Sequence, residues 1–311
     1  MAVPDPNMQT LVLIGPTASG KSALAMALAC ALRQSGRNAE ILSVDSMQVY
    51  RGMNIGTAKP TEAERAEVPH HLIDIVDPNQ SFTVASFVEL AEAVIRDSRA
   101  RQVPLIVTGG TPLYFKSLFE GIFEGPGADE AIRARLAGEE TAEMHRRLRL
   151  VDPTAAERIH ANDRRRLVRA LEVFELTGQP ISSFQTHWKS QQPKFDARWI
   201  GLTWDREALN RRINARVKQM IGGGWVDETS ALLMKYGTLS KTASEATGYA
   251  ELLEHLANRI SLDDAIEQIK IATRQLARRQ MKWFRRFRNV QWLDGARPVD
   301  ELAQQVLHAL A

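Results

Sequence analysis

The sequence predicts an α/β protein in which a parallel sheet carries helices on both faces and an all-helical insertion interrupts the core. Three apolar runs of strand length, 11–14, 41–44 and 105–107, alternate with segments of helical character such as 22–33 and 84–101. Strands that alternate with helices favour a parallel sheet. The ligands of such sheets collect at the carboxyl ends of the strands.

The strand pattern stops in the middle of the chain. Residues 128–177 are dense in Glu and Arg, and Leu and Ile recur among them at helical spacing. Residues 199–202 then have the pattern of a returning strand. Four more segments have helical character: 205–221, 225–236, 245–258 and 262–288. We therefore expect an α/β core that is interrupted by a helical insertion.

Composition excludes several classes of protein. The 311 residues are 44% hydrophobic and 25% charged, which is ordinary for a globular chain. No apolar run approaches the roughly 20 residues of a membrane span, and residues 1–10 show no signal peptide. The single cysteine, Cys30, excludes an internal disulfide and a multi-cysteine zinc site. We expect a cytoplasmic protein without a membrane segment, and take a monomer as the default.

A glycine-rich segment follows the first predicted strand and precedes a strong helix former, 23–28. This is the context that the P-loop pattern G-x-x-x-x-G-K-[ST] requires. The pattern is matched in full by Gly15, Pro16, Thr17, Ala18, Ser19, Gly20, Lys21 and Ser22. Backbone N–H groups and the helix N-terminus would surround phosphate oxygens, Lys21 would add a cation, and the Ser22 hydroxyl would suit Mg²⁺. The segment predicts a P-loop NTPase-like core for phosphate or diphosphate, without identifying the molecule that carries it.

Polar residues stand at the ends of the two other predicted strands. Asp45 follows the run 41–44, and Thr108 precedes Gly109 and Gly110. A carboxylate in this place serves as a Mg²⁺ ligand, as a general base beside the phosphate, or only as a helix or turn cap. Thr108 is equally open, since a Thr before two glycines also shapes turns. The spacing does not choose between these interpretations.

Basic residues are concentrated late in the chain. Segment 268–288 holds eight Lys/Arg and no acidic residue, although the net charge of the chain is only +3. Every fourth residue is basic, which forms a stripe that drifts slowly around one helix face: Lys270, Arg274, Arg278, Lys282 and Arg286. Such a face binds nucleic acid, a membrane surface or an acidic partner, or is merely solvated. The absence of acids favours a binding role, because ordinary surfaces intersperse both signs.

A phosphate-binding core beside basic helices favours phosphate chemistry on a nucleic acid. A shorter basic cluster, Arg164–Arg166 with Arg169, fits this interpretation or is an exposed helix start. No Asn-Lys-x-Asp sequence and no protein-kinase signature set occurs. The residues alone do not identify the reaction, and a small-molecule kinase that uses ATP in the same loop stays an alternative.

Several longer motifs lie in order between residues 10 and 290. They are Gly-Pro-Thr-Ala-Ser-Gly-Lys-Ser (15–22), Asp-Ser-Met-Gln-Val-Tyr-Arg-Gly-Met-Asn-Ile-Gly-Thr-Ala-Lys-Pro (45–60), His-His-Leu-Ile-Asp (70–74), Thr-Gly-Gly-Thr-Pro-Leu-Tyr (108–114), Asn-Asp through Arg-Ala-Leu-Glu-Val (162–173), Gly-Tyr-Ala-Glu (248–251) and Thr-Arg-Gln-Leu-Ala-Arg-Arg-Gln with Trp-Phe-Arg (273–285). With these motifs the chain resembles the bacterial type of the tRNA dimethylallyltransferase (isopentenyl-tRNA transferase) family. The motifs at 45–60 and 273–285 are highly specific to that family.

The resemblance implies transfer of a dimethylallyl group from dimethylallyl diphosphate to the exocyclic amine of adenosine 37 in tRNA. The adenosine has to be flipped out of its stack, because the amine is otherwise unreachable. The resemblance also implies a catalytic core of residues 1–115 and 195–311 with C-terminal basic helices, and an insertion domain of residues 116–194 for the anticodon stem-loop. Mg²⁺ is the expected cofactor, with Ser22 as its ligand. An enzyme that prenylates free adenine nucleotides is the remaining alternative, since it would share the P-loop and Asp45.

The resemblance also implies roles for individual residues of this sequence. Asp45 corresponds to the general base, Thr108 to a residue near the target adenosine, and Arg216 to an arginine that contacts the diphosphate. The P-loop, residues 15–22, corresponds to the diphosphate cradle. The expected tRNA-binding residues are Asp45, Ser46, Met47, Gln48, Thr108, Arg165, Arg166, Arg169, Gly248, Tyr249, Arg274, Arg278 and Lys282.

Overall fold

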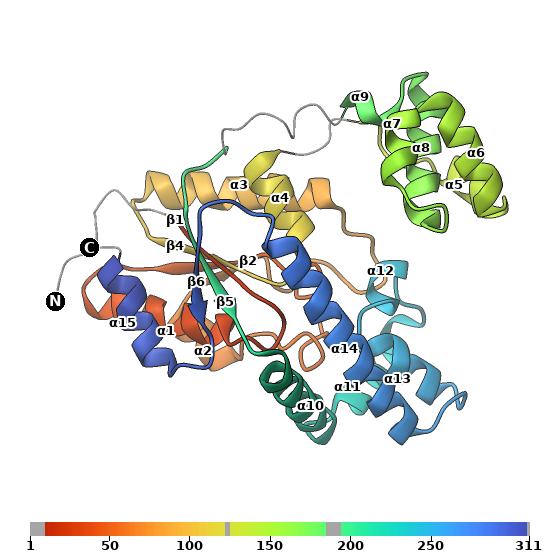
Figure 1. Cartoon of the computed structure of the whole chain (residues 1–311). Coiled ribbons are helices and arrows are strands. Elements are labelled where there is room, and N and C mark those ends of the chain that lie inside the picture. The colour runs from red at the N-terminus through yellow and green to blue at the C-terminus, as the bar shows by residue number, and fades with distance from the viewer. Residues whose placement is uncertain (1–9, 122–124, 185–193, 310–311) are drawn as a thin grey trace. The chain divides into compact units, whose positions relative to one another are not determined.

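A six-stranded parallel sheet forms the centre of the computed structural model, which describes residues 10–121, 125–184 and 194–309 (Figure 1). The prediction about a signal peptide falls on residues 1–10, of which the first nine lie outside this description. The strand order is β3-β2-β4-β1-β5-β6. The strands are β1 (Thr10–Ile14), β2 (Glu40–Ser43), β3 (His70–His71), β4 (Leu105–Thr108), β5 (Arg198–Thr203) and β6 (Val290–Asp294). The predicted α/β class with a parallel sheet is confirmed.

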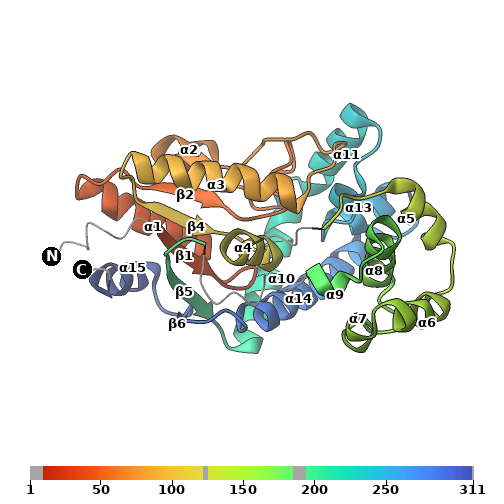
Figure 2. The same cartoon turned by 90° about the horizontal axis from the view of Figure 1, so that it is seen from above.

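The central strands are apolar along their whole length because both faces of the sheet are covered. Every residue of β1, β2 and β4 is buried, as is usual for strands of a parallel sheet. Helices α1 (Lys21–Gln34) and α15 (Val299–Ala309) pack together on one face, where their leucines and alanines form one hydrophobic cluster with the strands. Helix α3 (Val84–Ala100) and the start of α4 (Pro112–Glu120) lie on the opposite face (Figures 1 and 2).

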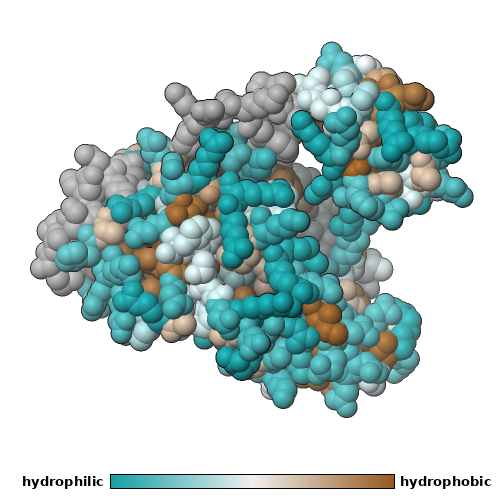
Figure 3. Space-filling view, viewed as in Figure 1, coloured by the Kyte–Doolittle hydropathy of each residue, from teal (hydrophilic) through white to brown (hydrophobic). Residues whose placement is uncertain are grey.

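The chain divides into two compact units. The larger, residues 1–115 and 195–311, contains the sheet and a group of helices that follow β5: α10 (Arg206–Gly222), α11 (Trp225–Tyr236), α12 (Lys241–Ser244), α13 (Tyr249–Leu256) and α14 (Leu262–Phe284). These helices share a second hydrophobic cluster with the loop that follows β2. Hydrophilic residues dominate the visible outer surface of α10 and α14 (Figure 3).

The smaller unit, residues 116–194, is helical wherever it has regular structure in its described part. Its helices are α5 (Glu130–Ala137), α6 (Thr141–Val151), α7 (Pro153–Arg158), α8 (Arg164–Thr177) and α9 (Ile181–Phe184). They enclose a core of their own around Leu136, Met144, Leu148, Leu167 and Leu171. Buried Glu172 ties the unit together, because it accepts hydrogen bonds from Arg133, Arg169 and the amide of Asp129.

Several elements were not predicted from the sequence. They include the two-residue strand β3, the edge strand β6 and the last helix, α15, together with the short helices α2 (Glu62–Glu67), α4, α9 and α12. Two predicted helices were too long, because α14 ends at Phe284 and α13 begins only at Tyr249. Strand β6 is held in the sheet by its pairing with β5. The ring of Trp292 in β6 fills the space beside Gly201 in β5, because a Cβ on Gly201 would lie 2.3 Å from that ring.

The loop after β2 runs from Val44 to Thr61 and is held by helix α11. The carboxylate of Glu228 accepts hydrogen bonds from three successive backbone amides, Asn54 at 2.9 Å, Ile55 at 2.8 Å and Gly56 at 3.3 Å. It also accepts one from the Tyr249 hydroxyl at 2.6 Å. A carboxylate suits four donors because it only accepts hydrogen bonds. Glu228 therefore fixes the loop that carries Asp45.

We expect Glu228→Gln to lower the free energy of unfolding by about 3 kcal/mol. The amide would turn an NH₂ group toward backbone N–H donors and leave at least one of them without an acceptor. Urea unfolding followed by circular dichroism measures the change. Glu89→Gln, the same substitution at an exposed position of α3, is the control and should change stability by less than about 0.5 kcal/mol. Equal stability of the two variants would contradict the role given to Glu228.

Candidate active site

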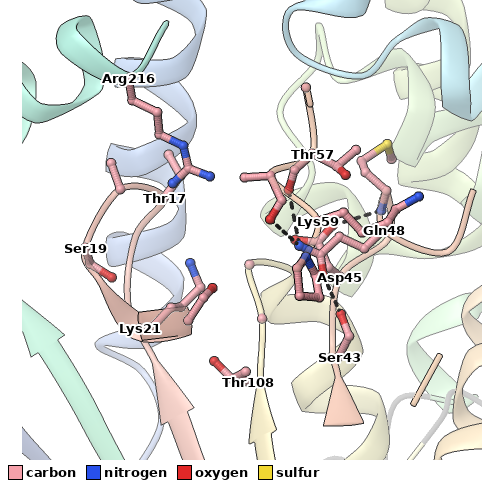
Figure 4. Close-up of a pocket in the computed structure, with 18 of the residues that line it drawn as sticks. Thr17, Ser19, Lys21, Ser43, Asp45, Gln48, Thr57, Lys59, Thr108 and Arg216 are labelled. Atoms are coloured by element: carbon pink, nitrogen blue, oxygen red, sulfur yellow. Dashed lines mark hydrogen bonds between the residues drawn. The ribbon is translucent and has the colours of Figure 1, made fainter. Parts of the chain in front are cut away.

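The P-loop opens onto a cavity of about 970 Å³ within the larger unit (Figure 4). Thr17 to Ser22 line it, together with residues 45–48 and 55–60 from the loop after β2, and 108–111 from the end of β4. Because β4 lies between β1 and β2, the parallel sheet brings the ends of all three strands to one edge. Helix α10 supplies Arg212 and Arg216, and α14 supplies Gln280. Gly15 and Pro16 do not line the cavity; a Cβ at Gly15 would lie 2.8 Å from Ser19 Oγ.

Three side chains hydrogen-bond to the P-loop backbone, and none of these contacts was predicted from the sequence. Arg212 Nε donates to the Ala18 carbonyl at 3.0 Å, and its guanidinium lies 4.4 Å from the centre of the Trp204 ring. Trp204 Nε1 donates to the Ser19 carbonyl at 2.9 Å. Gln280 Oε1 accepts from the Thr17 amide at 2.7 Å. The only signal in the sequence was that Gln280 closes a family motif and that Arg212 lies one helical turn before Arg216.

Positive charge is concentrated beside the P-loop. Burial lowers the pKa of Lys21 from 10.5 to about 8, because nearby Asp45 offsets the effect only in part and Arg216 adds to it. Burial also lowers the pKa of Arg216, with Asp45 again opposing and Arg212 reinforcing the shift. An arginine still keeps its proton at neutral pH. The site therefore contains desolvated cations that an anionic ligand would stabilise.

Asp45 and Thr108 face the same cavity as the P-loop (Figure 4). Asp45 Oδ1 accepts from the Met47 amide at 2.9 Å. Thr108 is 7% exposed, and its hydroxyl has no hydrogen-bond partner among the described residues; the same holds for Ser19, which is 1% exposed. Buried hydroxyls without partners are unusual in native proteins. Two of them beside one cavity indicate that a polar ligand completes their hydrogen bonds.

The three residues after Asp45 make different contacts. Ser46 and Met47 line the cavity, and the Ser46 amide donates to Thr111 Oγ1 at 3.0 Å. Both ends of the Gln48 amide are engaged within the protein. Its Oε1 accepts from Ser43 Oγ at 2.8 Å, and its Nε2 donates to the carbonyls of Thr57 and Ala58. Gln48 therefore stabilises the loop.

Gly248 and Tyr249 are buried, and Tyr249 lines the wall of the cavity. Tyr249 is fully buried and donates to Glu228, and its ring packs edge-on against Trp225 at 5.6 Å between ring centres. A Cβ on Gly248 would lie 1.9 Å from the Trp225 ring, so only glycine fits there. Gly248 has a φ of +95°, which also favours glycine. Through Trp225 and Glu228, the two residues stabilise the loop after β2.

The basic stripe of α14 is not uniform. Lys270 is 7% exposed and pairs with Glu267 at 2.6 Å, so the inclusion of Lys270 in an exposed stripe was wrong. Arg274 Nη1 donates to Asn214 at 2.9 Å. Arg278, Lys282 and Arg286 are exposed, as are Arg279, Arg285 and Arg288. The C-terminal end of the helix, with the turn that follows it, therefore presents most of the exposed positive charge.

In the helical unit, Arg165 and Arg166 are exposed at the start of α8. Arg169 differs from them, because it is tied to buried Glu172 at 2.7 Å and to the Pro126 carbonyl at 2.7 Å. Its guanidinium thus fixes the chain segment that enters this unit.

No helix in the described part of the chain is long and apolar enough to cross a membrane.

The residues present fit a Mg²⁺ ion of the kind that accompanies phosphates. Such ions keep several waters and bind substrate phosphates with only one or two protein ligands. Ser22, whose side chain carries a hydroxyl, lines the cavity next to Lys21, and Asp45 lines the same cavity. Among residues 10–121, 125–184 and 194–309, no cluster of three or more His, Cys, Asp or Glu side chains forms a separate metal site.

Comparison with known proteins gives one consistent result. The family model described as IPP transferase matches residues 48–287. The tRNA dimethylallyltransferase of Geobacter metallireducens is 46% identical over 96% of both chains. Among solved structures, the tRNA isopentenylpyrophosphate transferase of Bacillus halodurans has 37% identity and a TM-score of 0.71, with 98% of this chain and 96% of that chain covered. A eukaryotic dimethylallyltransferase acting on tRNA has 29% identity and a TM-score of 0.76, with 92% and 74% covered.

The pKa of Lys21 makes pyrophosphate binding depend on pH. With a pKa of about 8 in the empty site, Lys21 is partly neutral above pH 8, and the bound anion would raise its pKa again. We expect proton uptake on binding at pH 8.5, and an affinity that falls as the pH rises from 8 to 10. Calorimetry of inorganic pyrophosphate in buffers with different ionisation enthalpies measures the uptake. Lys21→Met is the control for protons bound by pyrophosphate itself. An identical uptake by Lys21→Met would refute the assignment.

Proposed function

The chain belongs to the tRNA dimethylallyltransferase (IPP transferase) family, and from this we propose that the cavity transfers a dimethylallyl group from dimethylallyl diphosphate to the exocyclic amine of adenosine 37 in tRNA. One observation carries the proposal. The P-loop, Asp45 and Thr108 line a single cavity in one compact unit. A transferase of this kind needs its anion site and its base within reach of the same reacting atoms.

The donor diphosphate would occupy the P-loop. The N-terminus of α1, Lys21 and Arg216 would face its negative charge, and the unpartnered Ser19 hydroxyl would donate to it. Two partly buried cations would stabilise the departing diphosphate more strongly than fully solvated cations would, because the protein already orients them. Arg216 therefore acts on the leaving group. Lys21 acts on binding and on the leaving group together.

The acceptor amine would lie beside Asp45. An adenine amine is a weak nucleophile because its lone pair is delocalised into the ring, and a carboxylate that accepts its hydrogen bond keeps that density available. As the new N–C bond forms, the C–O bond to the diphosphate breaks and the amine proton passes to Asp45. Thr108, whose hydroxyl lacks a partner in the described structure, would hydrogen-bond the adenine ring and hold it in line.

Mg²⁺ would be held by the Ser22 hydroxyl together with oxygens of the diphosphate. When bound, it supplies charge neutralisation at the leaving group. Asp45 lines the same cavity and accepts a hydrogen bond from the Met47 amide through Oδ1. We assign Asp45 to the amine rather than to the metal, as the family resemblance implies.

Contacts with tRNA would divide into two kinds. Ser46 and Met47, at the cavity, would approach the flipped base, whereas Arg278 and Lys282 would contact phosphates from the exposed face of α14. Arg274 would join them, and the helical unit would bind the anticodon stem-loop through Arg165 and Arg166. We propose supporting roles for Gln48, Arg169, Gly248 and Tyr249, because their side chains or backbones are engaged within the protein. The cytoplasmic location and the monomeric state stay predictions.

Asp45→Asn should lower kcat by at least roughly 10²-fold, the low end for removal of a general base. Affinity for tRNA and for pyrophosphate should change little, because the carboxylate acts in the transition state. Transfer of radiolabelled dimethylallyl to tRNA, measured across Mg²⁺ concentrations, tests this. Asp227→Asn, an exposed position on α11, is the matched control and should keep full activity. A variant that regained its turnover at high Mg²⁺ would instead identify Asp45 as a metal ligand.

Arg278→Gln and Lys282→Gln should each weaken tRNA binding and reduce its salt dependence by about one unit or less in the log–log slope. Selectivity for the adenosine should persist, because phosphate contacts position the ligand while base contacts specify it. Binding is measured at several salt concentrations, with thermal melting in parallel. Lys241→Gln, an exposed position on α12, is the control. Unchanged binding with a lower melting temperature would mean that these side chains stabilise the fold instead.

A further inference from the structure

Gln280 is the buried member of an exposed basic segment. It is 5% exposed, whereas its neighbours Arg278, Arg279 and Lys282 are exposed to solvent. Its side chain lines the cavity and makes two short hydrogen bonds in opposite directions. Oε1 accepts from the Thr17 amide at 2.7 Å, and Nε2 donates to the Gly110 carbonyl at 2.7 Å. One side chain therefore joins the P-loop to the loop that follows β4.

The loop after β4 is joined in turn to the loop that carries Asp45. The Val44 amide donates to the Thr108 carbonyl at 2.8 Å, and the Thr111 amide donates to the Val44 carbonyl at 3.2 Å. The Ser46 amide donates to Thr111 Oγ1 at 3.0 Å. These bonds lie on both sides of Asp45 in the sequence. A displacement of the loop after β4 would therefore displace Asp45 as well.

Close packing leaves these loops little freedom to shift. A Cβ on Gly109 would lie 2.0 Å from the Val44 carbonyl oxygen, so the two loops touch through their backbones. A Cβ on Gly110 would lie 2.9 Å from Gln280 Nε2 and 3.2 Å from Asp45 Oδ2. The Gln280 amide and the Asp45 carboxylate thus flank the same glycine. The hydrogen-bonded path from the P-loop to Asp45 is short and tightly packed.

We propose that Gln280 is a positioning residue that sets the distance between the donor diphosphate in the P-loop and the acceptor amine at Asp45. Displacement requires the reacting atoms to be about 3–3.5 Å apart and aligned, and a misplacement of about 1 Å costs on the order of 10²-fold in rate. Gln280 reaches both loops at once, which a shorter side chain cannot do. The inference rests on the proposed function, in which the P-loop holds the donor and Asp45 faces the acceptor.

The position of Gln280 on α14 also links the spacing of donor and acceptor to the binding of tRNA. The same helix presents Arg278 and Lys282 to solvent, where we propose that they contact tRNA phosphates. The side chain that spaces the donor from the acceptor is therefore anchored on the helix that holds the acceptor RNA. A shift of α14 would move Gln280 relative to both loops.

The test compares Gln280→Met, which keeps the length of the side chain and removes both hydrogen bonds, with Gln280→Asn, which keeps the amide and shortens its reach. Gln268→Met, on an exposed face of α14, is the matched control. For each variant we would measure kcat at saturating tRNA and dimethylallyl diphosphate, the Kd for inorganic pyrophosphate, the Kd for tRNA, and the melting temperature.

We expect kcat to fall on the order of 10²-fold in both Gln280 variants, with both Kd values within about threefold of wild type and Gln268→Met unchanged. Three outcomes would overturn the proposal. In the first, either Gln280 variant keeps its kcat. In the second, both Kd values weaken as much as kcat falls, which indicates general loss of structure. In the third, pyrophosphate binds more tightly to Gln280→Met, which means that Gln280 competes with the donor for the Thr17 amide. Failure of the proposed function is distinguishable, because wild type and Gln268→Met would then transfer no dimethylallyl group to tRNA.

Discussion

Buried positive charge at the end of β1 is the constraint on which the site depends. Lys21 and Arg216 are desolvated by the protein, and Asp45 is the carboxylate that offsets the loss of solvation for both. A single carboxylate does not balance two such cations, so an anion completes the site electrostatically. A diphosphate does this in the ground state and more strongly as its bond to carbon breaks. In the proposed function Asp45 also accepts a hydrogen bond from the amine, and its place across the cavity from the P-loop (Figure 4) agrees with that role.

Such a site requires a P-loop that keeps its shape without its ligand. Ala18 and Gly20 both have positive φ, as in the backbone turns that form anion-binding nests. This conformation leaves carbonyl groups directed outward, and Arg212 and Trp204 satisfy those of Ala18 and Ser19. Trp204 is in turn packed against Gly295, where a Cβ would lie 2.1 Å from the indole nitrogen. Two segments that are distant from the P-loop in the sequence, 204–212 and the turn at Gly295, thus preorganise one short loop.

The parts of the molecule that local sequence determines were the parts that could be predicted. An apolar run ending in Gly15 or Asp45 identifies a buried strand and its functional end, because the burial of both faces leaves a continuous hydrophobic pattern. Strand β6 could not be predicted, since only pairing with β5 and the fit of Trp292 beside Gly201 give it that structure. The side chains that support the P-loop could not be predicted from the sequence for a similar reason. Arg212 and Gln280 read as ordinary polar residues on helices, and only the tertiary structure shows that they face the P-loop.

Helix α14 directs some side chains to solvent and others to the cavity, and its helical period explains this difference. Residues 278 and 282 lie on one side and reach solvent, while residue 280 points to the opposite side and reaches the cavity. Charge on the outer side attracts any RNA phosphate and carries no sequence information. Selectivity must therefore arise inside, where Thr108, Ser46 and Asp45 line the cavity. A free adenine nucleotide would satisfy the inner residues alone and gain nothing from the outer charges. The proposed binding role of the exposed cations of α14 and of α8 therefore requires a polymeric acceptor, in agreement with the tRNA-modifying family to which the chain belongs.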